Sequence, residues 1–413
     1  MNRSKKHTKN VGSSQSYGDQ SSEITLNIYM NSVNDGMNSR REHIMEKENP
    51  NYEIAEVFYR LNIGVPIGND LVARAFELIL TDPNVKARDT QLGALLTGLM
   101  VGHPNMEEVV MLIKTALDID GVMKYKPTLP RGEKLVGVAG SGKKGHKTFN
   151  ISTPACLVAS AAGVYVAKPG STATSSISGS KDFLNTVGAR PLSSDDMIEV
   201  LLSTKFGMFS IEGLIPKFDA VYGGKMLAPT PLSFALPGIV NPVVCDALFY
   251  GLSHPNISLS LSVFLELGYR NVMIVSSSND KIHYIDELST LTSNFVGRIR
   301  EGEVIDVNEF SPTDITQRSA SNFNDLKSGA SLIENVQIGV RVLQGKLPGP
   351  CEDTVAINAS GIIVMSGKVA TLREGFELAI EAIRSGAGFR KLEEFIDVTK
   401  GSRKALSTII GEG

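Results

Sequence analysis

Cysteine is scarce in this 413-residue chain, which contains only Cys156, Cys245 and Cys351. The three lie far apart and lack the CxxC or Cys/His spacing that is typical of a metal cluster. We therefore expect reduced, buried thiols, as in a cytoplasmic protein.

Strong net charge and long apolar runs are missing as well. A formal net charge of -3 gives no field that would draw the whole molecule onto nucleic acid or an anionic membrane, so neither is an expected partner and any polyanion site must be local. The longest uncharged run, residues 231–245, contains three prolines and is shorter than the roughly 20 apolar residues of a membrane span. No apolar segment lies near Met1, so we expect neither a signal peptide nor a membrane anchor.

The chain divides into three parts that differ in composition and in the spacing of apolar residues. Residues 1–50 are rich in Ser, Asn, Lys and Glu, which predicts a disordered tail. Residues 51–125 show helical spacing of apolar side chains and predict a small helical domain, joined by helices around 193–210. Residues 126–413 alternate short apolar strands with helices. The expected fold class is therefore α/β with a small all-helical domain.

Several elements near the expected sites can be placed from local signals. Strands are expected at 136–139, 164–167 and 272–276, with a hairpin over 295–307 that turns at Glu301 and Gly302. Thr153 and Pro154 fit the N-cap and first position of a helix that runs through Ala162. Near the end of the chain, Thr371 and Glu374 predict a capping box, and Gly386 predicts a helix stop.

A glycine-rich loop follows the first of these strands. It is formed by Gly140, Ser141, Gly142, Lys143, Lys144 and Gly145, and Asn150, Ser152 and Thr153 lead from it into the helix. Glycines allow close approach of the backbone to a ligand, and the free amides and dipole at a helix start favour phosphate. The loop fits neither the Walker A nor the dinucleotide fingerprint. A glycine-rich turn before a capped helix explains the segment equally well.

A second hydroxyl-rich stretch, residues 168–176, follows the next strand, and Ser180 opens another helix. This strand is the next one in the chain after the glycine-rich loop and its helix. Lys168 and Ser176 therefore follow the carboxyl end of that strand. Two phosphate cradles at successive strand ends suit a diphosphate. A flexible linker has a similar composition, but linkers seldom lie between a buried strand and an amphipathic helix.

Two adjacent carboxylates, Asp286 and Glu287, lie about ten residues beyond the strand that ends near Ser276. Such a pair can bind Mg²⁺ that is bridged to substrate phosphates, because Mg²⁺ prefers a few carboxylates together with water and phosphate oxygens. Taken alone, the pair is better explained as two acidic residues at a helix N-terminus than as a metal site.

Taken together, these segments resemble the anthranilate phosphoribosyltransferase family, whose relatives include pyrimidine nucleoside phosphorylases. The similarity runs from about residue 55 to 397. Its main matches are residues 148–153 (TFNIST), 166–168, 178–180 and 286–289, where Asp286 and Glu287 match the metal-binding DE motif.

The resemblance implies a helical domain hinged to an α/β domain, a homodimer, a phosphoribosyl diphosphate donor and two Mg²⁺ ions. It also implies transfer of ribose 5-phosphate to a nitrogen on an aromatic ring, with release of diphosphate. By this resemblance Lys168, Asp286 and Glu287 are catalytic, and Ser152, Asp286 and Glu287 face the metals. The substrates would be bound by Gly140, Ser141, Gly142, Lys143, Lys144, Asn150, Ser152, Thr153, Lys168, Ser176, Ser180 and Lys225.

The chain departs from the family both beside the donor and towards the acceptor. Beside the donor, Lys143 and Lys144 replace the Gly-Asp of the family loop GTGGDG. Towards the acceptor, the family's KHGNR becomes the sequence of residues 168–172, without His, Asn or Arg. The arginine expected to meet the anthranilate carboxylate falls on Gly224 or Lys225, and the expected His-Pro-Ala falls on residues 215–217. Loss of a bidentate partner weakens carboxylate recognition, although Lys217 or Lys225 could act as a point charge. We therefore predict a nitrogen acceptor other than anthranilate.

Two other functions fit parts of the pattern. A nucleoside phosphorylase would use the extra lysines for inorganic phosphate, and a non-catalytic nucleic-acid-binding or regulatory protein would explain the altered acceptor motif. The matches at TFNIST and DE favour the transferase over the phosphorylase. The retained donor and metal residues argue against a non-catalytic protein, because a pure binding protein needs no magnesium carboxylates.

Overall fold

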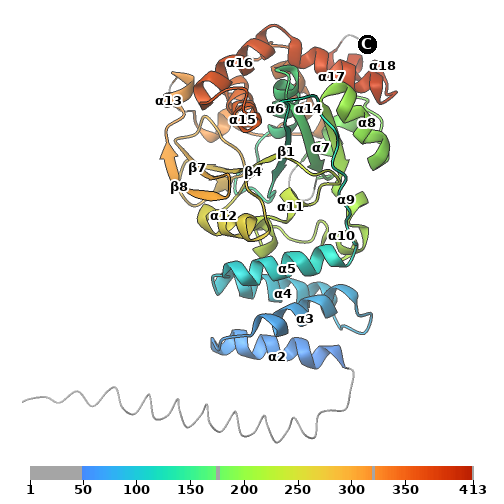
Figure 1. The fold of residues 1–413 in the computed structure, drawn as a ribbon, viewed down its shortest axis with the longest axis vertical. Helices are drawn as coiled ribbons and strands as arrows, with labels where there is room; N and C mark the ends of the chain where they lie inside the picture. The colour runs from blue at the N-terminus through green and yellow to red at the C-terminus, as the bar shows by residue number, and fades with distance from the viewer. Residues whose placement is uncertain (1–48, 174–176, 319–320, 412–413) are drawn as a thin grey trace, which may run out of the picture. The chain divides into compact units, whose positions relative to one another are not determined.

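A mixed sheet organises the chain and brings the expected site segments to one edge (Figure 1). Its strands are β1 (Leu135–Gly140), β2 (Tyr165–Gly170), β3 (Phe206–Ser210), β4 (Ala247–Gly251), β5 (Val272–Ser278), β6 (Tyr284–Ile285), β7 (Ser293–Arg300) and β8 (Glu303–Phe310). The strand order is β3-β2-β1-β4-β5-β7-β8, with β6 paired to β5. The strands β3, β2, β1, β4 and β5 are parallel, whereas β6, β7 and β8 are added antiparallel.

The computed structural model describes residues 49–173, 177–318 and 321–411. From Pro50 onward the chain forms one compact unit. The predicted disordered tail, apart from its last two residues, and the predicted ligand-binding residue Ser176 lie outside the described residues. Among the helices that the structure does describe, none combines the length and the apolar character needed to span a membrane.

The predicted strands at 136–139, 164–167 and 272–276 form as β1, β2 and β5, because each is a short apolar run that is buried within the sheet. Five of the six residues of β1 are fully buried, and all six of β2 are. The hairpin of β7 and β8 turns at Glu301 and Gly302. Their φ angles of 53° and 89° lie in the left-handed region, which glycine adopts readily. The strands β3, β4 and β6 were not predicted.

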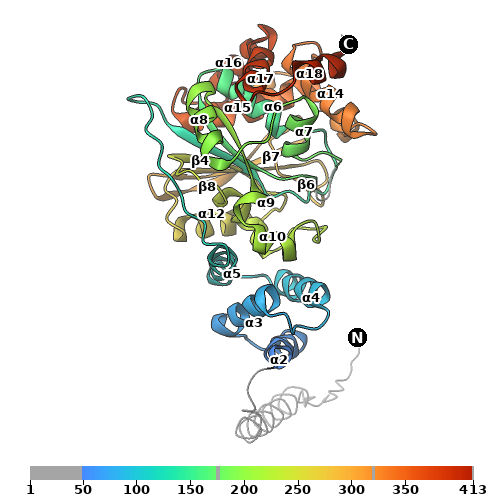
Figure 2. The same cartoon turned by 90° about the vertical axis from the view of Figure 1, so that its right-hand side faces the viewer.

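Helices cover both faces of the sheet (Figure 2). One face is covered by α6 (Ser152–Ala161), α7 (Ser180–Thr186), α8 (Ser194–Thr204), α14 (Leu332–Leu343), α15 (Pro350–Ser366), α16 (Leu372–Arg384), α17 (Ala387–Val398) and α18 (Arg403–Ile410). The other side carries α9 (Ile211–Leu214), α10 (Pro216–Tyr222), η1 (Pro231–Phe234), α11 (Leu236–Ile239) and α12 (Ile257–Glu266). The remaining short helices are α13 (Thr313–Thr316) and η2 (Phe323–Leu326). The capping box of Thr371 and Glu374 at the start of α16 is confirmed.

The N-terminal helices are α2 (Pro50–Ile63), α3 (Asn69–Thr81), α4 (Arg88–Val101) and α5 (Met106–Asp118). Their apolar side chains join the core that fills the α12 side of the sheet, and α5 packs against α12 and η1. The expectation that helices around 193–210 join this group is wrong for α8, which instead packs on β3 and α17. The reason is that its apolar face, including Met197 and Leu201, belongs to the core on the opposite side of the sheet.

The start of α6 also differs from the expectation. The helix begins at Ser152, with Ile151 as its N-cap, so Thr153 lies inside the helix. The side chain of Asn150 caps it instead: its Oδ1 accepts the Thr153 N–H at 3.2 Å. Tertiary hydrogen bonds hold Asn150 there, since its N–H donates to Asn335 Oδ1 at 2.9 Å and its Nδ2 donates to the Gly179 carbonyl at 3.0 Å. These long-range partners were not visible in the local pattern.

Candidate active site

The carboxyl ends of β1 and β2 and the start of α6 open onto one cleft of about 1030 Å³. Parallel strands place their carboxyl ends at the same sheet edge, which is where ligands of open α/β sheets bind. Most of the residues singled out in the sequence line this cleft: Gly140, Gly142, Lys143, Lys144, Asn150, Ser152, Lys168, Ser180, Asp286 and Glu287.

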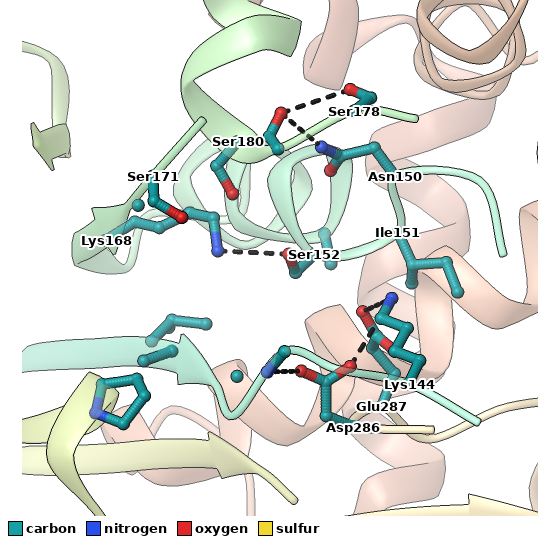
Figure 3. Close-up of a pocket in the computed structure, with 18 of the residues that line it drawn as sticks. Lys144, Asn150, Ile151, Ser152, Lys168, Ser171, Ser178, Ser180, Asp286 and Glu287 are labelled. Atoms are coloured by element: carbon teal, nitrogen blue, oxygen red, sulfur yellow. Dashed lines mark hydrogen bonds and ion pairs between the residues drawn. The ribbon is translucent and has the colours of Figure 1, made fainter. Parts of the chain in front are cut away.

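Figure 3 shows these side chains in two groups that face one another across the cleft. Lys168, Ser152 and Ser180 lie on one wall, and Lys144, Asp286 and Glu287 lie on the other. The Nζ of Lys168, a residue that is only 2% exposed, donates to Ser152 Oγ at 3.1 Å. A buried ammonium group beside a helix N-terminus makes the first wall a site for an anion.

Three predicted ligand-binding residues lie elsewhere. Ser141 is tied behind the loop, where its Oγ accepts the Ser253 N–H at 2.8 Å. Thr153 is buried within α6 and does not line the cleft. Lys225 pairs with Asp89 on α4 at 2.6 Å and lines neither the cleft nor the pocket next to it. Ser176 is outside the described residues.

The carboxylates reach the cleft because two glycines leave room for them. Gly140 at the end of β1 pairs in register with Gly251 at the end of β4. A Cβ atom on Gly140 would collide with the Asp286 carboxylate, and one on Gly251 would collide with the Asp286 backbone carbonyl. The loop N–H of Gly142 then donates to Asp286 Oδ2 at 2.8 Å. The pair follows β6 and does not begin a helix, so the interpretation as a helix N-terminus is wrong.

Lys144 is the cation that faces this pair. Its Nζ lies 2.6 Å from Glu287 Oε1 and 3.5 Å from Asp286 Oδ1, and it also donates to Thr148 Oγ1 at 3.1 Å. Both carboxylates are buried, with exposures of 6% and 4%. A lysine of the loop therefore neutralises part of the charge that the sequence assigned to metal binding.

The electrostatic balance differs between the two carboxylates. Burial, and secondarily the neighbouring Asp286, raise the pKa of Glu287 to about 8, although Lys144 opposes the shift. Burial acts on Asp286 in the same direction, but Lys144 and the Gly142 N–H outweigh it and hold the pKa of Asp286 below its ordinary value. Glu287 is thus the group whose charge depends most on a nearby cation.

The pair has unused capacity for a cation. Asp286 Oδ1 and Glu287 Oε2 are buried and accept no hydrogen bond among the described residues. Hard oxygen ligands of this kind suit Mg²⁺, so the residues present fit a metal ion even with Lys144 beside them. Ser152, the third expected metal ligand, lies on the opposite wall (Figure 3).

Three further residues near the site were missed as functional residues. Asn358 on α15 accepts the Leu288 N–H at 3.0 Å and donates to the Leu288 carbonyl at 2.6 Å, which fixes the loop after the carboxylates. Tyr222 and Asp219 on α10 line a second pocket beside the cleft. Residues 358–359 also resemble the family, so the resemblance could have marked Asn358. No local signal marked Tyr222 or Asp219.

The geometry agrees with comparisons to known proteins. Residues 132–389 match the family model described as "Glycosyl transferase family, a/b domain". The anthranilate phosphoribosyltransferase of Acetivibrio thermocellus is 31% identical over 335 residues, which cover 76% of this chain and 88% of that protein.

Solved structures show the same fold. A crystal structure of the Thermus thermophilus anthranilate phosphoribosyltransferase has a TM-score of 0.67 at 23% identity and covers 83% of this chain and 98% of that one. The Saccharomyces cerevisiae enzyme, in complex with PRPP (phosphoribosyl diphosphate) and Mg, has a TM-score of 0.70 at 22% identity and covers 84% and 98%.

Fold, site and family model together define a glycosyltransferase of the pentosyltransferase class. Within that class, the chain belongs to the anthranilate phosphoribosyltransferase-like family and is a phosphoribosyltransferase.

Proposed function

We propose that this protein transfers ribose 5-phosphate from phosphoribosyl diphosphate to a nitrogen of an aromatic or heterocyclic acceptor other than anthranilate, with Mg²⁺ at Asp286 and Glu287. The observation that carries the proposal is the opposition of two walls in one cleft: Lys168 with the start of α6 on one, and two buried carboxylates on the other. A diphosphate with bound Mg²⁺ complements both walls.

The chemistry follows from the charge that develops as the diphosphate departs. The ribose carbon becomes positive and the leaving group becomes more negative, so preorganised positive groups at the leaving group lower the barrier. Bound Mg²⁺ would neutralise the diphosphate. Lys168 and the α6 N-terminus would hold the same group, and Gly142 keeps Asp286 oriented through its N–H. No protein nucleophile is required.

The acceptor assignment rests on where the lysines lie. Lys225 pairs with Asp89, and Lys217 donates to the Ile119 carbonyl at 3.1 Å. Gly224, the other position expected to carry the arginine, lines the second pocket without a side chain. Neither lysine is therefore placed to bind a carboxylate on the acceptor.

The test supplies purified protein with phosphoribosyl diphosphate, Mg²⁺ and a panel of aromatic amines and nitrogen heterocycles, and measures diphosphate release. We expect release with at least one panel member and its loss in Glu287→Gln. Efficient turnover of anthranilate would refute the acceptor assignment. Failure of phosphoribosyl diphosphate to raise the melting temperature in the presence of Mg²⁺ would refute the donor assignment.

A nucleoside phosphorylase is the second candidate, favoured by the lysines of the loop. The Lys144 ammonium already neutralises part of the carboxylate pair, which lowers the repulsion that an anion such as inorganic phosphate would meet there without Mg²⁺. Phosphate-dependent release of a base from nucleosides, measured without Mg²⁺, separates this activity from the transferase.

We also propose a homodimer formed through α2. Tyr52, Tyr59 and Ile63 share one face of this helix and are 67%, 68% and 59% exposed. Contiguous exposed apolar side chains mark association surfaces. Light scattering should report a dimer that Tyr59→Glu dissociates, whereas Tyr125→Glu, at an exposed tyrosine outside α2, should leave it intact. A monomeric wild-type protein would contradict the proposal.

The division into helical and α/β domains near residue 125 and a cytoplasmic location stay predictions.

A further inference from the structure

A second pocket of about 720 Å³ adjoins the cleft and shares Gly140, Gly142 and Lys143 with it. The rest of its lining is largely apolar and comes mainly from α9, α10 and α11: Ile211, Ile215, Phe218, Met226, Leu236 and Val240. Phe218 and Tyr222 stack with ring centroids 4.9 Å apart and planes at 25°. A flat aromatic molecule fits such a lining, and the shared loop would bring it next to a ligand in the cleft.

One acid, Asp219, lines this apolar pocket. Its carboxylate takes no hydrogen bond and no ion pair from the described residues. It lies against Gly223, where a Cβ atom would collide with its Oδ1, so the glycine allows the carboxylate to lie within the pocket wall. Burial, and then the nearby Glu212, raise the pKa of Asp219, with Lys181 opposing. Asp219 is thus a half-buried acid without a counter-ion in contact with it among the described residues.

The lysines around the pocket are held by groups other than Asp219. Lys143 donates from Nζ to the Tyr222 hydroxyl at 2.9 Å and lies 4.8 Å above the same ring. Lys181 lies 3.8 Å from Glu212, which also accepts hydrogen bonds from Thr172 and Ser210. Glu212 is therefore satisfied by its own neighbours, and Asp219 is an acid of the pocket wall without a partner among the described residues.

We infer that the acceptor is an aromatic or heteroaromatic ring that presents a positively charged or N–H-donating nitrogen group to Asp219, in addition to the nitrogen that receives the ribose. This inference rests on the proposed phosphoribosyl transfer and specifies its acceptor. A carboxylate at the same place on the ring would face Asp219 and be repelled, because like charges opposed in a partly desolvated site are unfavourable.

Three probes that differ only in one ortho substituent test this specificity: 2-aminobenzylamine (cationic), 2-aminobenzamide (neutral N–H donor) and anthranilate (anionic). Each keeps the ring and the aromatic amine. Binding is measured by calorimetry with the wild-type protein in the presence of phosphoribosyl diphosphate and Mg²⁺. We expect the benzylamine to bind at least about tenfold more tightly than anthranilate, with the benzamide between them.

Variants then locate the cause. Asp219→Asn should bring the three dissociation constants to within about threefold of one another, because it removes the charge and keeps the shape. The matched control, Asp195→Asn at an exposed position of α8, removes one negative charge far from the pocket and should keep the wild-type order. Circular dichroism verifies that both variants fold.

Tighter binding of anthranilate than of the benzylamine, or no binding of any probe, would overturn the inference, and so would an unchanged order in folded Asp219→Asn. The donor readout is separate. If phosphoribosyl diphosphate with Mg²⁺ stabilises the protein while the order of the probes is reversed, the acceptor inference fails and the transferase assignment stands. If the donor has no effect, the transferase assignment itself fails.

Discussion

Replacing Lys144 with methionine should expose the charge that this lysine neutralises. Its Nζ lies 2.6 Å from Glu287 and 3.5 Å from Asp286, and Lys144 itself is mostly buried, with 17% of its side chain exposed. Methionine keeps the length of the side chain and removes the ammonium group. Two adjacent buried carboxylates then remain without the cation that faces them in the structure.

The cost can be worked from the burial of the pair. Removing one partner of a buried ion pair destabilises a protein by about 3–5 kcal/mol, because the charge left behind stays desolvated. Unfolding entropy is about 2.1 cal/mol/K per residue, so the roughly 360 residues from Pro50 onward give about 0.8 kcal/mol/K. In a metal-free buffer the melting temperature of Lys144→Met should therefore fall by about 4–7 °C.

Added Mg²⁺ should reverse much of this loss, because the divalent ion no longer competes with a lysine for the same oxygens. Each tenfold gain in Mg²⁺ affinity adds about 1.4 kcal/mol of stabilisation at saturating metal. Melting curves in EDTA and in MgCl₂ measure the difference, and the electron paramagnetic resonance signal of Mn²⁺ measures metal affinity directly. The control is Lys281→Met, which removes an exposed lysine paired with Glu309 and should change neither quantity.

Two outcomes would refute the reasoning about Lys144. One is a melting temperature in EDTA equal to that of the wild-type protein. The other is an identical Mg²⁺ response in the variant and the wild type, since it would mean that the lysine and the metal do not share a binding place.

Other parts of the site and core yield three more predictions. Lys168→Met should lower the rate of diphosphate release about 10²- to 10³-fold with little change in the circular dichroism spectrum, because it removes a preorganised charge from the cleft; an unchanged rate would contradict that role. Gly140→Ala should weaken Mn²⁺ binding about 10- to 100-fold, because the added Cβ displaces the Asp286 carboxylate, and resonance titration would show retained affinity if the reasoning is wrong. Burial raises the pKa of Asp353 from 3.8 to about 6, so the folded state holds a proton that the unfolded state has lost between these pH values, and stability falls as pH rises through this window. Asp353→Asn should remove about 1–3 kcal/mol of that fall, measured by urea unfolding at pH 4 and pH 7, and a variant with the same pH dependence as the wild type would argue against it.

The segments expected to bind phosphate could be located from the sequence because the signals that mark them are local. Gly140 and Gly142, Ser152 at a helix start and Lys168 at a strand end follow from glycine content, strand patterns and capping signals within a few residues. The same locality explains why the hairpin turn at Glu301 and Gly302 and the capping box at Thr371 were confirmed.

Other expectations failed where distant partners decided the outcome. Thr153 lost the N-cap position because Asn150 is held by Asn335 and Gly179, both far along the chain. Lys225 does not lie at the acceptor side, because it forms an ion pair with Asp89 on an N-terminal helix. Ser141 turned inward to Ser253.

The sequence by itself determined the strands β1, β2 and β5, the β7–β8 hairpin, the glycine-rich loop before α6 and the family of the enzyme, because periodicity, turn residues and contiguous motifs can be recognised without a structure. Only the tertiary structure decided how charge is distributed across the site. It brought Lys144 onto Asp286 and Glu287 through the paired glycines of β1 and β4, and it set Asp219 in an apolar pocket. Those contacts join residues up to 144 positions apart in the sequence. Electrostatic energies depend on the distance between charges in space and on burial, and no local pattern of residues encodes either quantity.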